Sequence, residues 1–265
     1  DLCQGQSKPT LINCTITKNH AFGTEGGTRY GGFAANTGSV ISLYNTLVEG
    51  HTDLAAREED PWPNVPANLA QIVPAYCLFV NNPQGDVYDY DTHTAYTGGD
   101  NLDANLAGAH DNVAGGPDPQ YMSVLSGQWS AAPVFSAAAY TTTLTVAGTP
   151  FQGLNLSGYL LNADTAQWRQ TPIFSNTNNS ITVWGDITSA TGVYGMADAG
   201  DTFAVYNPRL KAISPCINTG TNDTAIAPYY DLDYIVRGTT NCIGAFENNA
   251  PAVAQVVSIT PTEGP

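Results

Sequence analysis

Positive charge is scarce in this chain of 265 residues. Eight Lys and Arg residues stand against 23 Asp and Glu, which gives a net charge of −15 at pH 7. Nucleic-acid-binding proteins need a basic face to neutralise phosphates, and anionic membrane surfaces attract basic segments. The composition therefore argues against both partners. Long hydrophobic runs are also lacking: no stretch of about twenty apolar residues occurs, so we expect no membrane span.

Motifs of familiar catalytic and cofactor sites are absent as well. The sequence has no H-E-x-x-H zinc motif, no C-x-x-C pair, no G-x-S-x-G nucleophile elbow and no phosphate-binding glycine loop before a helix. Two of the histidines, His20 and His51, follow successive copies of the repeat described next, where we expect surface positions. The sequence predicts no cofactor, with calcium as the one exception considered below.

The start of the chain carries a repeat. Residues 9–19 are echoed about thirty residues later by residues 39–50, and more faintly by residues 75–82, a period typical of stacked repeats. Each copy reads as two short strands around a turn residue, so the stack would be a parallel β-helix with equivalent residues about 4.8 Å apart. The alternative is unrelated strands of a sandwich. The alignment predicts these columns: Cys14, Asn45 and Cys77; Thr15, Thr46 and Leu78; Ile16, Leu47 and Phe79; Ile12 with Leu43.

Two blocks of the sequence resemble a known family. Residues 8–16 read K-P-T-L-I-N-C-T-I and resemble the S-P-T-L-x-N-C-T-I repeats of right-handed parallel β-helix surface and secreted proteins, which include bacterial polymorphic outer-membrane-type proteins. Residues 214–247 resemble the closing motif S-P-C-I-D-x-G…D-L-D-G-x-P-R…I-G-A-Y-E of those proteins. Asn218, Tyr234 and Phe246 depart from that motif, which has Asp, Gly and Tyr there. The resemblance implies a pectate-lyase-like solenoid, and says little about function.

The pattern of strand and turn candidates divides the chain into four parts. Five strand candidates with alternating polarity predict a small antiparallel barrel or sandwich inserted in the solenoid, and they are residues 141–146, 159–161, 171–175, 180–184 and 202–206. The best helix candidate is residues 66–73. We predict β-helix rungs in 1–119 with side loops at 53–74 and 84–116, the insert in 120–207, the closing segment in 208–248, and an extended tail in 249–265.

The five cysteines suggest one disulfide. Cys216 and Cys242 flank the same segment, and a bridge between them would close a loop worth roughly 3 kcal/mol of stability. Cys14 and Cys77 lie two rungs apart in the predicted stack, too far for a bond, so we interpret them as buried thiols. Cys3 has no assigned partner.

The densest acidic cluster is Asp86, Asp89 and Asp91. Alternating carboxylates and backbone carbonyls can supply the oxygen ligands that Ca²⁺ prefers, although the spacing is not that of an EF-hand loop. A solvated acidic loop is the alternative. Aromatic residues beside these carboxylates suit sugar rings, and we note Tyr88, Tyr90 and Trp62 as ligand-binding candidates.

The sequence as a whole predicts an extracellular structural or adhesive protein of the cell surface. The tail carries an apolar, β-prone stretch with Val253, Val256, Val257 and Ile259 that can add as a strand to a neighbouring copy and build a homopolymer. The alternative is a carbohydrate-binding protein, or a lyase or hydrolase acting on polysaccharides. We do not favour an enzyme, because no arginine lies beside paired acids in a repeat.

Overall fold

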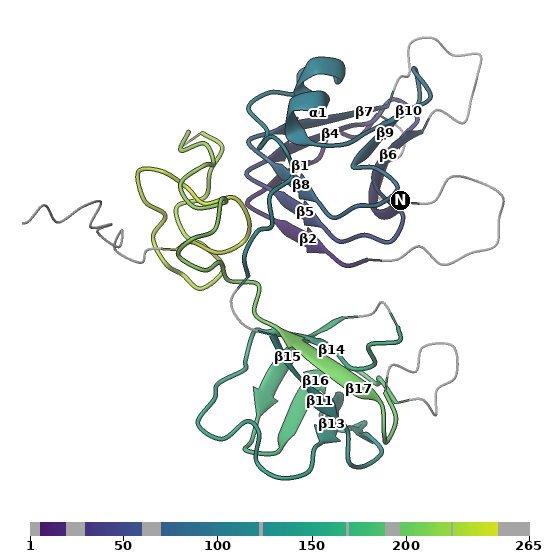
Figure 1. Ribbon diagram of the computed structural model, residues 1–265, viewed down its shortest axis with the longest axis vertical. Helices are drawn as coiled ribbons and strands as arrows, with labels where there is room; N and C mark the ends of the chain where they lie inside the picture. Colours follow the sequence, from purple (N-terminus) through teal and green to yellow (C-terminus); the bar gives the residue numbers. More distant parts are fainter. Residues whose placement is uncertain are drawn as a thin grey trace, which may run out of the picture.

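The computed structural model describes residues 6–19, 30–59, 70–121, 124–167, 170–188, 197–223 and 225–248. In them the protein is almost entirely β (Figure 1). The upper body is a stack of short strands, the lower body is the insert, and an irregular segment beside the stack follows the insert in the chain. No helix in these residues is long and apolar enough to cross a membrane.

Three parallel sheets form the stack. The chain contributes one strand to each sheet in turn and then returns to the first, so sequence-distant strands become neighbours. The sheets are β1–β4–β7 (Thr10–Ile12, Val40–Tyr44, Gln71–Ala75), β2–β5–β8 (Thr15–Thr17, Leu47–Glu49, Leu78–Val80) and β3–β6–β9 (Tyr30–Asn36, Leu54–Glu59, Val87–Asp89), with β10 (Thr94–Tyr96) antiparallel to β9. Each circuit of three strands is called a coil below.

The register of the stack corrects the predicted columns by one residue in the middle copy. Ile16 pairs with Val48, which pairs with Phe79, and Leu11 pairs with Leu43. The predicted columns with Leu47 beside Ile16 and with Ile12 beside Leu43 are therefore wrong. Since side chains alternate between faces, a one-residue slip would turn Val48, which is fully buried, away from the core.

The corners of the coils depend on single residues with a left-handed backbone. After the first strand of each coil these are Asn13, Asn45 and Tyr76, with φ of 51°, 49° and 54°. Asn adopts this conformation at a lower cost than most residues. The recurrence of Asn in the repeat thus has a backbone cause. The equivalent residues after the second strand are Lys18, Gly50 and Asn81.

The two ends of the stack differ. Beyond the third coil lies the helix α1 (Gly99–Asn105), whose Leu102 and the following Leu106 are buried in the stack's core. At the other end β1 and β2 are the outermost strands of their sheets. Leu11 and Ile16 there are only partly buried, whereas their partners in the second coil are fully buried.

Parts of the predicted side loops belong to the stack. The segment 53–74 contains β6 and most of β7, and the segment 84–116 contains β9, β10 and α1. The predicted helix at 66–73 is wrong in its last three residues, because Gln71 begins β7; residues 60–69 lie outside the described part of the chain. The described residues thus form three coils, whose first two strands correspond to the two clear copies and the one faint copy of the sequence repeat.

The insert is one antiparallel sheet of seven strands. All five predicted strands are confirmed, and two more precede them. The order is β11–β17–β14–β15–β16–β13–β12, with bounds Val124–Gln128, Thr202–Tyr206, Leu160–Asn162, Thr171–Asn176, Ser180–Trp184, Thr141–Thr145 and Val134–Ser136. The sheet is not closed into a barrel. It surrounds a core in which Trp129 stacks on Phe203 with ring centroids 4.1 Å apart.

The closing segment covers the side of the stack. Its described residues, 208–223 and 225–248, contain no strand, only isolated bridges. Leu210, Cys216 and Ile243 pack against Leu47 and Leu78 of the β2–β5–β8 sheet. The segment is thus a lateral cover and not a further coil.

The recurring corner asparagines anchor this cover. Asn13 Nδ2 donates to Cys242 O at 3.1 Å, and Asn45 exchanges hydrogen bonds with the backbone N and O of Thr221 at 2.7 and 2.9 Å. Behind them, Arg237 and Glu247 form a buried ion pair at 3.0 Å. The first repeat of the chain and its closing segment are therefore in direct contact.

Candidate functional sites

The predicted calcium ligands do not converge. Asp86 is buried and accepts a hydrogen bond from Gly98 N at 2.7 Å, whereas Asp89 accepts hydrogen bonds from Asp91 N and Thr92 Oγ1, both at 2.8 Å, in a turn. Asp91 is exposed. Nowhere in the described residues do three or more His, Cys, Asp or Glu side chains form a group that could hold a metal ion.

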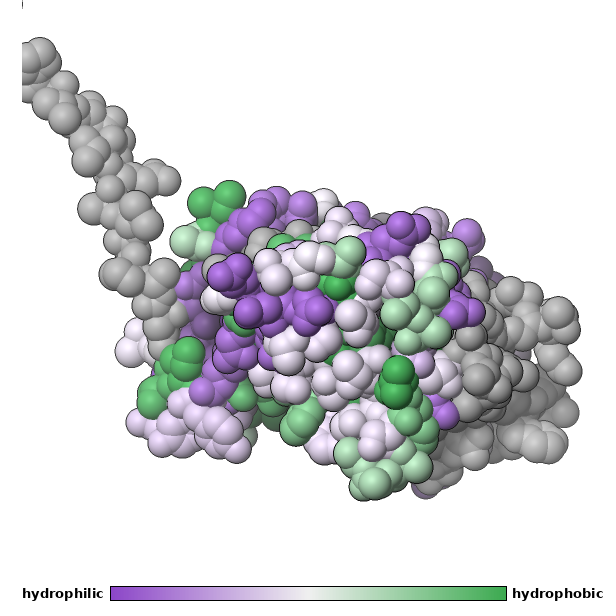
Figure 2. All heavy atoms as spheres, turned by 90° about the horizontal axis from the view of Figure 1, so that it is seen from below, coloured by the Kyte–Doolittle hydropathy of each residue, from purple (hydrophilic) through white to green (hydrophobic). Residues whose placement is uncertain are grey.

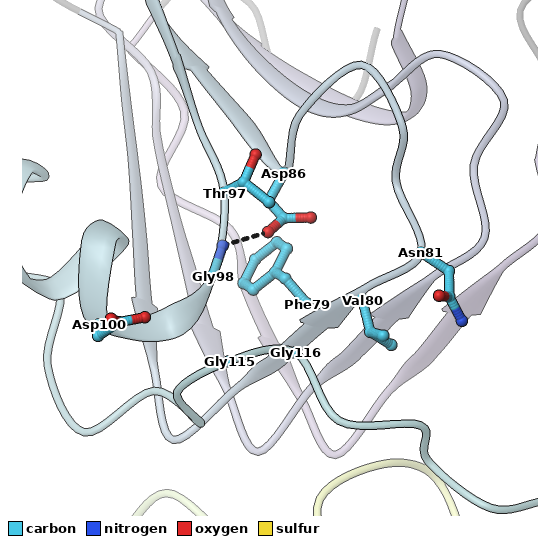
Figure 3. Close-up of a pocket in the computed structure, with 9 residues that line it drawn as sticks. All are labelled: Phe79, Val80, Asn81, Asp86, Thr97, Gly98, Asp100, Gly115 and Gly116. Carbon is cyan, nitrogen blue, oxygen red and sulfur yellow. Dashed lines mark hydrogen bonds between the residues drawn. The ribbon is translucent and has the colours of Figure 1, made fainter.

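Asp86 lines a cavity of about 320 Å³ beside the third coil (Figure 3). Its second carboxylate oxygen accepts a hydrogen bond from Asn82 Nδ2 at 2.7 Å, so both oxygens are used within the protein. Burial raises the pKa of Asp86 against the effect of these hydrogen bonds. The other acid of the cavity, Asp100, lies apart on α1, and Gly115 and Gly116 form the opposite wall. Asp86 thus ties the coil to the start of the helix.

A second cavity, of about 190 Å³, is lined by acidic residues that lie far apart in the sequence. Glu58 of β6 lines it together with Asp89 and Asp91. Glu58 Oε1 accepts a hydrogen bond from Ile72 N at 2.6 Å, and its carboxyl group is hydrogen-bonded to that of Asp89. Burial, assisted by the charges of Asp89 and Asp91, raises the pKa of Glu58 to about 8 although the Ile72 amide opposes it. Glu58 is therefore protonated at neutral pH.

Glu58 links two neighbouring coils. It belongs to β6 of the second coil, and the backbone amide that it binds belongs to Ile72 of β7 in the third coil. A raised pKa fits a general acid, and Asp89 and Asp91 are the other acids that line this cavity.

The predicted sugar-binding aromatics are not an open platform. Tyr88 is half-buried under the guanidinium of Arg57, 5.5 Å from its ring centroid, and Tyr90 packs edge-on against His93. Trp62 lies outside the described residues. Tyr88 and Tyr90 are thus used for packing around the acidic turn.

The predicted disulfide is not formed. Cys216 and Cys242 are free, buried thiols in one apolar cluster, and burial raises their pKa values to about 12 and 11. Cys14 and Cys77 are also free thiols, but only Cys77 is buried as predicted, whereas Cys14 is half-buried; Thr46 lies between them in the stack. Cys3 lies outside the described residues. Burial raises the pKa of all four described thiols, whereas a reactive cysteine has a lowered pKa.

His51 is buried, against the expectation of a surface position. Its Nδ1 accepts a hydrogen bond from Asn19 N at 3.2 Å, and its Nε2 has no partner. The side chain fits because Gly31 and Gly32 run beside it: a Cβ at Gly31 would lie 3.2 Å from His51 Cβ, and one at Gly32 would lie 3.4 Å from His51 Nε2. Burial lowers the pKa of His51, so the ring is a neutral core group. His20 lies outside the described residues.

The insert carries an aromatic pair that the sequence analysis missed. Phe174 of β15 and Trp184 of β16 are 47% and 50% exposed, and their ring centroids are 4.5 Å apart at an interplanar angle of 52°. Strand alternation was the available signal: Ile173 and Val183 are buried, so Phe174 and Trp184 must face outward.

A second exposed group lies in the closing segment. Residues 229–237 form a short hairpin in which Arg237 N donates to Tyr229 O at 3.0 Å and Tyr234 has a left-handed φ of 61°. This is the position where the motif has Gly. The exposed side chains here are Tyr229, Tyr230, Leu232, Tyr234, Ile235 and Val236.

These features define an all-β protein with a parallel-strand scaffold and an antiparallel insert. Comparison of the chain with protein-family models, with curated proteins and with solved structures finds no match.

Proposed function

We propose that the protein is an extracellular structural and adhesive protein whose coils form a right-handed parallel β-helix and whose copies assemble end to end. Three parallel sheets visited in strict rotation support the solenoid. Connections between parallel strands of one sheet are right-handed in about 98% of cases, which supports the hand.

The observation that carries the assembly is the difference between the two ends of the stack. Helix α1 covers the core beyond the third coil. At the first coil, strand β1 pairs with β4 of the second coil on one side, and Ser42 N donates to Pro9 O at 3.1 Å just before the strand begins. No described strand pairs with its other side. Such an edge is a template for an added strand.

The occupant we propose is the C-terminal tail of a neighbouring copy. Its apolar residues Val253, Val256, Val257 and Ile259 lie outside the described part of the chain. They follow Asn248, which is anchored to the stack's cover by a hydrogen bond from its Nδ2 to Leu210 O at 2.8 Å. Addition of one chain's strand to the next chain's edge is a heterologous contact, and such contacts build filaments when they do not close.

The test compares the full chain with a variant that lacks residues 249–265. Sedimentation velocity and electron microscopy should find polymers of the full chain and monomers of the variant. Thr10→Pro should have the same effect, because the exposed Thr10 has its backbone N–H on the side of β1 that faces away from β4, and the substitution removes this donor while it leaves the tail intact. Folding of each variant is checked by far-ultraviolet circular dichroism. Polymers of the shortened chain, or monomers of the full chain, would contradict the proposal.

A further inference from the structure

We propose that the outer face of the insert binds a neutral polysaccharide chain, with Phe174 and Trp184 as the platform on which sugar rings stack. This names a ligand for the adhesive part of the proposed function, and it does not depend on assembly. Figure 2 views the molecule from the side of the insert and shows apolar residues in small groups among polar ones. Phe174 and Trp184 are both about half exposed on the insert.

The position of Phe174 is created by an irregularity in the sheet. Ile173 pairs with Val183, but the next pair is Ser175 with Thr182, so Phe174 is the extra residue of a β-bulge. Bulges re-aim side chains and are common beside functional sites. Here the bulge brings the Phe174 ring against Trp184 while Ile173 stays in the core. Two large apolar rings therefore stay half in water, at a hydration cost that a ligand would relieve.

The chemistry of the face selects an uncharged ligand. Strands β12, β13, β15 and β16 contain no charged residue, in a protein whose net charge is −15. An acidic polysaccharide would be repelled by the net charge and would find no basic partner on these strands. Partly exposed hydroxyl groups lie on the strands beside the rings: Thr143 of β13 is directly opposite Thr182 of β16, and their Oγ1 atoms are 3.3 Å apart.

The angle between the rings favours a single chain. Rings that bind a flat crystalline surface must be coplanar, whereas these two planes differ by 52°. Successive sugar units of a twisted, soluble chain present their faces at an angle to one another and can meet both rings. Stacking covers the apolar face of a sugar, and the threonine hydroxyl groups can exchange hydrogen bonds with its rim.

The test is affinity electrophoresis of the full chain in gels that contain soluble β-1,3-glucan, xylan or polygalacturonate. Retardation by at least one neutral polysaccharide and none by polygalacturonate is expected. Trp184→Ala and Phe174→Ala should each weaken binding by about tenfold or more, because truncating a central aromatic anchor has effects of this size. Leu232→Ser, which removes an exposed apolar side chain outside the insert, is the matched control and should bind as the wild type does.

Three outcomes would overturn the proposal: retardation by polygalacturonate alone, no retardation in any of the three gels, or unchanged retardation of the Phe174→Ala and Trp184→Ala variants. Dimers of the wild type that Trp184→Ala dissolves, without glycan binding, would assign the face to a second copy instead. Both variants alter exposed side chains, and near-ultraviolet circular dichroism of the buried Trp129–Phe203 stack confirms that the core is intact.

Discussion

The stack and the insert are both β structures, but they bury their cores differently. In the stack, each coil contributes a few apolar residues that pack on the same positions of the neighbouring coils, such as Ile16, Val48 and Phe79. In the insert, one sheet surrounds an aromatic centre with Trp129 and Phe203. A stack gains stability from neighbour to neighbour, whereas a single core is lost as a unit. The stack is thus suited to be extended, and the insert to display a fixed surface.

The largest expected effect separates the two cores. Phe79→Ala and Phe203→Ala each remove a buried ring, which costs about 3–5 kcal/mol. Hydrogen-exchange mass spectrometry should find protection lost in the stack for the first variant and in the insert for the second. Loss of protection in both regions for either variant would show one cooperative unit and would contradict the comparison.

The next effect concerns the corners of the stack. Asn45→Ala should destabilise the protein by about 2–3 kcal/mol, because it places Ala in a left-handed conformation and removes two hydrogen bonds to Thr221. Asn81→Ala is the matched control, since Asn81 is also left-handed but exposed, and should cost about 1 kcal/mol. Urea denaturation measures both. Equal losses would mean that the contact with Thr221 contributes nothing.

The third effect is a pH dependence located in the stack. The pKa of Glu58 is raised to about 8 in the folded protein, so the folded state holds this proton more tightly than the unfolded state does. Its contribution to stability is therefore complete below about pH 4.5 and is lost as the pH rises from there through about 8. In Glu58→Gln the urea midpoint should change less with pH between about 4.5 and 8 than it does in the wild type. Glu59→Gln, at a more exposed position, is the control. An unchanged pH profile in Glu58→Gln would contradict the shared proton.

The smallest effect tests how strongly the two regions are coupled. Arg209 lies over the rings of Tyr159 in the insert and Phe246 in the cover, and its guanidinium pairs with Asp233 at 2.6 Å. These groups are partly exposed, so Arg209→Ala should cost about 0.5–1 kcal/mol. Differential scanning calorimetry should find a wider gap between the transitions of stack and insert. A loss of several kcal/mol would mean that the regions fold as one.

Several features of the fold followed from sequence patterns, and others could not. Alternating polarity located all five predicted strands of the insert. The repeat located the first two coils, but its alignment slipped because the spacing changes from 32 residues between Ile16 and Val48 to 31 between Val48 and Phe79. Helix α1 was missed because Gly, Asp and Asn are poor helix formers; the i, i+4 pair Leu102 and Leu106 was its one signal.

The candidate sites were harder to predict, since they depend on contacts between coils and on one bulge. Glu58 and Asp89 belong to adjacent strands of a parallel sheet, and nothing in the local sequence of either residue reveals the other. Trp184 is outward by alternation, but the bulge that brings Phe174 beside it depends on pairing with a neighbouring strand. Which residues meet in these two pairs is decided by how the strands pair in the folded protein, and not by residue type.

Affinity electrophoresis in a neutral-glucan gel tests the division of roles between stack and insert most directly. Three proteins are compared: the full chain, the variant lacking residues 249–265, and the double variant Phe174→Ala with Trp184→Ala. The account predicts that the shortened chain is retarded in proportion to its monomer size with unchanged affinity, and that the double variant migrates as if no glucan were present. Loss of retardation in the shortened chain, or full retardation of the double variant, would contradict it.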